Sequence, residues 1–188
     1  MAEKFILHGN AFCRLTVRNL KLFLKDKMQV FFSLLAPLIV LFLYVAFLGD
    51  VQMDGLRSAV PEGLVDDNLL RAVVDGWMMS GILAVTCITV AISVSSVAVA
   101  DNERGISCDF DSSPVSQSIV RFSYMASSYI CTLAITFIML AIGFIYLAIS
   151  GWYLDAGQVF AVIGNVFLSA LSSTLFATLA VSFFRSTS

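Results

Sequence analysis

Four long stretches of this sequence contain no Asp, Glu, Lys, Arg or His: Met28–Gly49, Gly76–Ala100, Phe122–Leu154 and Ala156–Phe184. Each is longer than the roughly 20 apolar residues with which a helix, rising about 1.5 Å per residue, crosses a hydrocarbon core of about 30 Å. Backbone polar groups cannot be left unpaired in lipid, so runs of this length must be helical. The sequence therefore predicts an all-α, polytopic transmembrane helical bundle.

The lack of ionisable side chains in these stretches also argues against several mechanisms. Proton-coupled or sodium-coupled transporters and voltage sensors use charged residues inside the membrane, and hydrolases use paired carboxylates or a metal. No GxxxxGK[ST] phosphate-binding loop, CxxC motif or Cys/His cluster is present. We expect no catalytic residue, metal or cofactor in this chain, so energy for any transport would come from another subunit.

Positive charge is distributed unevenly along the chain and predicts its orientation. With the N-terminus in the cytoplasm, nine of the 11 Lys and Arg residues would face inward and only Arg57 and Arg71 outward. This matches the positive-inside rule. The predicted single domain, residues 1–188, then contains spans at about 29–49, 76–100, 122–150 and 157–184, with the loop 101–121 on the cytoplasmic side. We expect Asp50–Asp75 to be a water-facing outer segment interrupted at Gly55.

Residues 11–25 are expected to form an amphipathic helix on the membrane surface, with Asn10 as its N-cap. At 100° per residue its cationic side chains share one face, and Phe12, Thr16 and Phe23 lie on the other. The cations would lie among anionic headgroups and the aromatic face among acyl chains. An alternative is that they are ordinary positive-inside residues on an extension of the first span. The cationic face consists of Arg14, Arg18, Lys21 and Lys25.

Small and hydroxylated residues recur at helical spacing in three of the spans. The second span places one such group on one face, as do Ser128, Thr132 and Thr136 in the third span. Such residues let membrane helices approach closely and hydrogen-bond across the contact, so packing is the default explanation. A weakly polar translocation face is the alternative for the group in the second span. That group consists of Thr86, Thr89, Ser93 and Ser96.

The loop between the second and third spans holds a charged cluster and a serine-rich segment. Asp101-Asn102-Glu103-Arg104-Gly105 follows the second span, and Ser113-Pro114-Val115-Ser116 precedes the third. With the basic surface helix before the first span, this arrangement resembles permeases of type-2 ATP-binding-cassette (ABC) exporters. The resemblance covers the whole chain in topology. It departs from the family in one respect, because such permeases have six spans. We therefore expect this chain to be the first part of a six-span domain, truncated after the fourth span; the alternative is a four-span protein that has lost the remaining helices.

The resemblance implies a function for the loop. In such permeases it forms a coupling helix that docks on a separate nucleotide-binding ATPase subunit, which binds ATP-Mg. The matching positions here are Glu103, Arg104, Gly105, Pro114, Val115 and Ser116. Pro114 suits the first turn of a helix, Ser112 or Ser113 could cap it, and Phe110 would be an exposed aromatic anchor. The alternative for this loop is a solvated turn.

The resemblance also implies the remaining partners and the location of the protein. We expect a second permease subunit, in a homodimer or heterodimer, a lipid bilayer and no nucleic acid. The location would be a bacterial cytoplasmic (inner) membrane, and the function ATP-driven export of a substrate that the sequence does not identify. The competing hypothesis is a non-transporting membrane scaffold or sensor subunit, whose helices only pack against partner helices.

Overall fold

The computed structural model describes residues 2–59, 65–106 and 115–186, and all regular structure in these ranges is helical. The prediction of an all-α bundle is confirmed. The elements, in chain order, are α1 (Ala2–Lys25), α2 (Lys27–Leu43), the π-helical segment η1 (Tyr44–Leu48), α3 (Gly49–Ala59), α4 (Asp67–Glu103), α6 (Gln117–Ser150) and α7 (Ala156–Ser186).

Four helical segments in the described residues are long and apolar enough to cross a membrane: Lys27–Ala59, Asp67–Glu103, Gln117–Ser150 and Ala156–Phe183. The first two of these segments are longer than the corresponding charge-free stretches, because a helix that crosses the lipid can continue by one or more turns into the water-facing region beyond it. With 37 residues, α4 is about 55 Å long, well beyond a core of about 30 Å. The prediction that Gly55 interrupts the chain is wrong. Gly55 lies inside α3, where an exposed glycine costs about 1 kcal/mol without stopping the helix.

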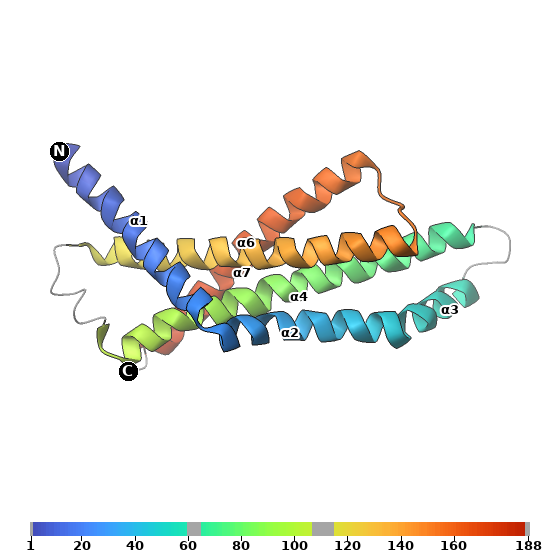
Figure 1. The fold of residues 1–188 in the computed structure, drawn as a ribbon, viewed down its shortest axis with the longest axis horizontal. Coiled ribbons are helices and arrows are strands. Elements are labelled where there is room, and N and C mark those ends of the chain that lie inside the picture. The colour runs from blue at the N-terminus through green and yellow to red at the C-terminus, as the bar shows by residue number, and fades with distance from the viewer. Residues whose placement is uncertain (1, 60–64, 107–114, 187–188) are drawn as a thin grey trace.

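The helices are arranged around a central pair, α4 and α6. In Figure 1, α2, α4 and α6 run along the long axis of the molecule, and α1 and α7 lie oblique to them. Of the most apolar window of each span, 44% is buried in α4 and in α6, against 17% in α2–α3 and 22% in α7. Both termini, the end of α4 and the start of α6 lie at one end, which we call the terminal end (Figure 1). We call the opposite end the α3 end.

The contact between α4 and α6 is built from small and hydroxylated side chains, as the helical spacing indicates. Ser128, Thr132 and Thr136 are all at most 1% exposed. The Thr136 hydroxyl lies 3.4 Å from Cys87 Sγ on α4. At Gly143 an added Cβ would come within 2.3 Å of the Met79 side chain, so this helix pair needs glycine there unless Met79 moves.

The N-terminal helix is longer than expected. It begins at Ala2, so the predicted N-cap at Asn10 is wrong: Gly9 and Asn10 are exposed positions inside the helix, which tolerates them at a modest cost. A single non-helical residue, Asp26, separates α1 from α2, and its carboxylate accepts a hydrogen bond from the Gln29 backbone N–H at 3.1 Å. This cap fixes the point at which the chain turns from α1 into the first span.

The first span continues through Pro37, a buried residue inside α2, and changes its geometry one to two turns later. Residues Tyr44–Leu48 form the π-helical segment η1, and the helix then resumes as α3. Short π segments inside α-helices occur often at functional sites. In this chain η1 places Tyr44 in the core at the α3 end.

Candidate functional site

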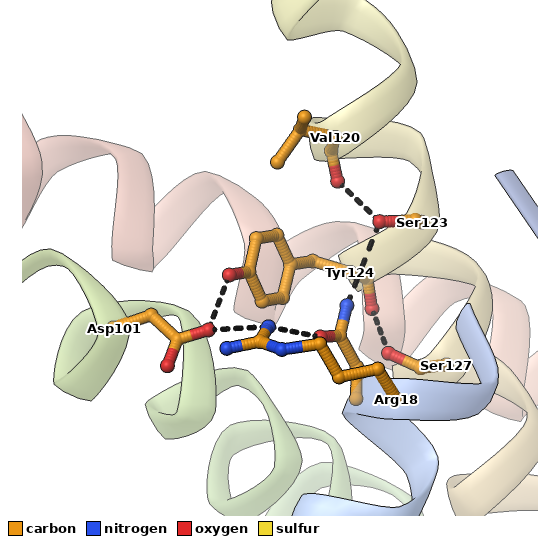
Figure 2. Close-up of polar contacts among 7 residues, drawn as sticks. Arg18, Asp101, Val120, Ser123, Tyr124 and Ser127 are labelled. Carbon is orange, nitrogen blue, oxygen red and sulfur yellow. Dashed lines mark hydrogen bonds and ion pairs between the residues drawn. The ribbon is translucent and has the colours of Figure 1, made fainter. Parts of the chain in front are cut away.

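A buried carboxylate joins three helices at the terminal end. Asp101 lies in the last turn of α4 and is 4% exposed. Its Oδ2 accepts a hydrogen bond from Arg18 Nη1 of α1 at 2.9 Å and another from the Tyr124 hydroxyl of α6 at 2.5 Å. Figure 2 shows the guanidinium and the phenol converging on this one oxygen. The end of α4 is thereby tied to both neighbouring helices, and we call this group the Asp101 network.

Further polar contacts extend the network along α6. Arg18 Nη1 also donates to Asn19 Oδ1 at 3.0 Å, and Asn19 Nδ2 lies 3.5 Å from Ser123 Oγ. Ser123 in turn donates to the backbone carbonyl of Val120 at 2.7 Å (Figure 2). Asn19 is 2% exposed, so its amide needs these partners inside the protein. The first turns of α6 are therefore held against α1 by hydrogen bonds as well as by packing.

The charges of the Asp101 network compensate one another. A carboxylate taken out of water costs several kcal/mol unless a cation and hydrogen-bond donors accompany it. Burial alone would lower the pKa of Arg18, but the hydrogen bond and the negative charge of Asp101 outweigh burial and raise the pKa above its usual value. Arg18 therefore stays charged. If Arg18 moved away from Asp101, the buried carboxylate would lose its compensating charge, which is energetically unfavourable.

Apolar packing lies directly beside this polar network. Phe23 of α1 is fully buried, and it clusters with Val90 and Val94 of α4 and with Cys131 and Ile135 of α6. The prediction that the aromatic face of the N-terminal helix lies among acyl chains is thus wrong for Phe23. Sequence periodicity identifies an apolar face but does not tell whether lipid or other helices cover it.

The cationic face of α1 divides into two parts. Arg14, Lys21 and Lys25 are exposed, whereas Arg18 is half-buried and bound to Asp101. All four side chains line one shallow, open stretch of the surface of α1. Three of the four predicted cations are therefore exposed, and the fourth has a structural role that the sequence did not indicate. Binding of this face to lipid headgroups stays a prediction.

The predicted coupling residues flank the Asp101 network as far as the structure describes them. Glu103 ends α4, and the backbone N–H of Arg104 donates to the carbonyl of Ala100 at 3.1 Å. Gly105 has a φ of 74°, a left-handed conformation that favours glycine. The side chains of Glu103 and Arg104 are exposed. The docking role of this charged turn stays a prediction.

The other half of the predicted coupling segment is only partly visible. Ser116 occupies the N-cap position of α6 and is exposed, and Val115 before it is half-buried. Phe110 and Pro114 lie outside the described residues, as does the cap predicted for Ser112 or Ser113. In the described part, helix α6 begins at Gln117.

The hydroxyl group on α4 does not form one uniform surface. Thr86 is fully buried, Thr89 and Ser93 are half-buried, and Ser96 is exposed. All four hydroxyls donate to backbone carbonyls of α4 itself at 2.7–2.8 Å. Gln29 of α2 also donates to Ser96 Oγ at 2.6 Å. These contacts fit helix packing, and the translocation role of this face stays a prediction.

Sequence reasoning assigned Asp75 and Asp101 to water-facing connections, and the structure corrects both assignments. Asp75 is 3% exposed and receives hydroxyl contacts from Tyr44 and Tyr146 at the α3 end. For Asp75, the sequence does contain a pattern that indicates burial. Asp75 shares a helical face with Met79 and Ile82, because residues four and seven positions apart align on a helix. Tyr124 and Asn19 had no such signal, since hydroxyl and amide residues are common in any span.

Comparison with known proteins identifies the family. A family model described as ABC-2 type transporter matches residues 10–188. Neither the comparison with curated proteins nor the comparison with solved structures finds a match. Members of this family are membrane components of ABC transporters, which work in a lipid bilayer with an ATPase subunit. With a match over nearly its whole length and four helices able to cross a membrane, the chain belongs to the ABC-2 type transporter family, as a multi-pass permease.

Proposed function

We propose that this chain is the permease subunit of an ATP-driven exporter and that a separate ATPase subunit drives it through the loop 101–121. The observation that carries the proposal is the Asp101 network. Asp101 lies at the start of this loop and Tyr124 just beyond its end, and Asp101 accepts hydrogen bonds from both Tyr124 and Arg18 of α1. A force applied to the loop would therefore reach three helices at once.

The distribution of charge and the arrangement of the helices support a cytoplasmic location for this loop. Both termini, the end of α4 and the start of α6 lie at the terminal end (Figure 1). Of the 11 Lys and Arg residues, Arg57 in α3 and Arg71 near the start of α4 are the two that follow the first apolar stretch and precede the second, toward the opposite end. From the positive-inside rule we infer that the terminal end is cytoplasmic and that α3 faces outward. A bacterial inner membrane is the location that we propose.

The proposed mechanism begins with the ATPase docking on Glu103, Arg104 and Phe110. ATP binding and hydrolysis, with Mg²⁺ held in that partner, would move the loop and with it the end of α4. The ion pair between Asp101 and Arg18 would carry the movement to α1, which lies oblique to the bundle. Rocking of rigid helices between inward-open and outward-open states is a common form of alternating access.

The uncovered helices support pairing with a second permease subunit. Only 17% of the most apolar window of α2–α3 and 22% of that of α7 is buried within one chain. Large apolar side chains such as Phe42, Phe160 and Phe176 are at least 68% exposed. These faces are available to lipid and to a second permease, identical or different, so that a complete transporter would contain two permease subunits and two ATPase subunits.

The test is to replace the exposed coupling residues and to measure ATPase docking and transport separately. Glu103→Ala, Arg104→Ala and Phe110→Ala, in the full-length protein, should weaken co-purification of the ATPase and reduce ATP-dependent efflux from reconstituted vesicles. Membrane insertion should be normal, because the side chains of Glu103 and Arg104 are exposed and all three residues belong to the predicted loop outside the spans. Asp54→Ala on α3 and Lys21→Ala on α1 are matched controls that remove an exposed charge elsewhere.

The outcomes separate a transporter from a scaffold. Reduced docking and efflux in the three loop variants, with both controls unchanged, would support the coupling function. If no ATPase binds the wild-type protein, or if all three variants retain full docking and efflux, the coupling assignment is wrong. The chain would then act as a membrane scaffold or sensor subunit.

A further inference from the structure

A second buried carboxylate, at the α3 end, is not compensated in the way that Asp101 is. Asp75 Oδ1 accepts hydrogen bonds from the hydroxyls of Tyr44 at 3.2 Å and of Tyr146 at 3.4 Å. Asp75 Oδ2 is buried and has no hydrogen-bond partner in the described part of the chain. Native proteins pair nearly all buried polar atoms, so an unpartnered carboxylate oxygen indicates a missing ligand.

A cavity of about 100 Å³ lies beside this carboxylate. Asp75 lines it together with residues of η1, α3, α4 and α6. The charged residues that line it besides Asp75 are Asp50 and Arg71, both exposed. At roughly 30 Å³ per water molecule, the cavity has room for a small ion with one or two waters or for an ammonium group. Drug-sized molecules occupy sites of at least about 300 Å³ and do not fit.

The charges around the cavity do not neutralise Asp75. The ion pairs found within 4.0 Å among the described residues are Arg18–Asp101 and Arg57–Asp67, so Arg71 lines the cavity without pairing with Asp75. The lining carries two carboxylates and one guanidinium, a net charge of −1. This charge matches a monovalent cation. Divalent ions favour several carboxylate ligands, and no group of three or more such ligands occurs in the described residues.

The position of Asp75 makes the missing charge costly. Asp75 and Asp101 are 26 residues apart on α4, or about 39 Å, so they lie near opposite boundaries of a core of about 30 Å. An uncompensated carboxylate at such a boundary is expensive, and intramembrane ionisable residues generally mark ion or substrate sites. A cation satisfies both the charge and the free oxygen.

We propose that Asp75 binds a small monovalent cationic group in this cavity, with the carboxylate as the charged ligand and the Tyr44 and Tyr146 hydroxyls holding it in place. The group is either a free alkali ion or the ammonium head of a larger molecule. The π-helical turn η1 forms one wall of the site, since Tyr44 and Val45 both line the cavity. The site lies at the end opposite the Asp101 network and does not depend on coupling to an ATPase.

The test is the thermal stability of the purified full-length protein at constant ionic strength, in different chloride salts. A ligand that binds only the folded state raises the unfolding midpoint. Replacing N-methyl-D-glucamine, which is too large for the cavity, by Na⁺, K⁺ or methylammonium should raise the midpoint by about 3 °C or more at saturation. A shift with Na⁺ or K⁺ alone identifies a resident ion. A shift with methylammonium alone identifies the ammonium head of a larger ligand.

Two variants assign the effect to this cavity. Asp75→Asn should abolish the cation-dependent shift, whereas Asp54→Asn, an exposed acid on α3 that does not line the cavity, should keep it. Arg71→Gln removes the positive charge from the lining and should lower the half-saturating cation concentration severalfold. Because Arg71 is exposed, this second variant tests the site even if Asp75→Asn fails to fold.

Three results would overturn the proposal. One is a wild-type midpoint that does not differ between the four cations. Another is a cation-dependent shift of the same size in Asp75→Asn. The third is an unchanged half-saturating concentration in Arg71→Gln.

Discussion

The hydroxyl of Tyr124, on the second turn of α6, lies 2.5 Å from Asp101 Oδ2 in the last turn of α4. These two residues lie at the two ends of the segment that connects the second and third spans. Arg18 of α1 reaches the same oxygen at 2.9 Å. The three helices α1, α4 and α6 thus contact one buried charge at the terminal end. Moving one of them without the other two would break a charge-assisted hydrogen bond.

Removing the Tyr124 hydroxyl should destabilise the protein without changing its shape. Tyr124→Phe deletes one hydrogen bond to a buried carboxylate, which costs about 1.5–3 kcal/mol. Thermal unfolding of the purified protein should show a midpoint several degrees lower. Tyr129→Phe is the matched control on α6, because Tyr129 makes none of the hydrogen bonds found in the Asp101 network among the described residues. Equal midpoints for Tyr124→Phe and wild type would contradict the assigned hydrogen bond.

Neutralising Arg18 should be more harmful than neutralising its exposed neighbour. Arg18→Gln leaves Asp101 buried beside a single hydroxyl donor, and because Arg18 is partly solvated we expect a loss of about 1–3 kcal/mol. Arg14→Gln removes the same charge from the same face of α1, where the side chain is exposed. The comparison uses unfolding midpoints in detergent. A loss of similar size in both variants would mean that the general cationic surface, rather than the ion pair, stabilises α1.

Thr132 offers a test of whether the hydroxyls between α4 and α6 serve packing. The Thr132 hydroxyl is fully buried and has no hydrogen-bond partner among the described residues. Thr132→Val keeps the shape and removes an unsatisfied polar atom, so stability should be unchanged or higher. Thr132→Ala leaves a small void and should lower the unfolding midpoint. A large loss of transport with normal stability in Thr132→Val would instead indicate a functional hydroxyl.

The long helices and the composition of their contacts could be predicted from the sequence. Lipid requires helices wherever charge is absent over about 20 residues, and the spacing of Ser128, Thr132 and Thr136 already places them on one face, which the structure buries. Helix ends were predicted less well. Asn10 and Gly55 are favourable at caps and turns, but the helix continues through both, because a helix interior tolerates such residues at a modest cost.

The polar centres could not be predicted because their members are far apart in the sequence. Asp101 is separated by 83 residues from Arg18 and by 23 from Tyr124, and Asp75 by 31 from Tyr44 and by 71 from Tyr146. In the sequence, an acidic residue at the edge of an apolar run is as consistent with the start of a solvated loop as with a buried carboxylate. The packing of α1 and α6 around the end of α4 decides that Asp101 is buried.

The proposed orientation can be checked by labelling single cysteines. On a background without Cys13, Cys87, Cys108 and Cys131, we would introduce Ser58→Cys on α3 or Ser118→Cys on α6, both at exposed positions. A membrane-impermeant thiol reagent added to intact cells should modify position 58 and leave position 118 unmodified until the cells are opened. The reverse pattern would place the terminal end outside and remove the basis for ATPase docking on the loop 101–121.

The central claim is that the ion pair between Arg18 and Asp101 transmits the movement of the loop to the rest of the permease. Its most direct test is a double-mutant cycle on the number of substrate molecules transported per ATP hydrolysed, in vesicles containing the permease and its ATPase. We expect Arg18→Gln and Asp101→Asn each to lower this ratio while ATPase docking is retained, and the double variant to lower it no further. Independent, additive losses, or an unchanged ratio in the single variants, would contradict transmission through this pair.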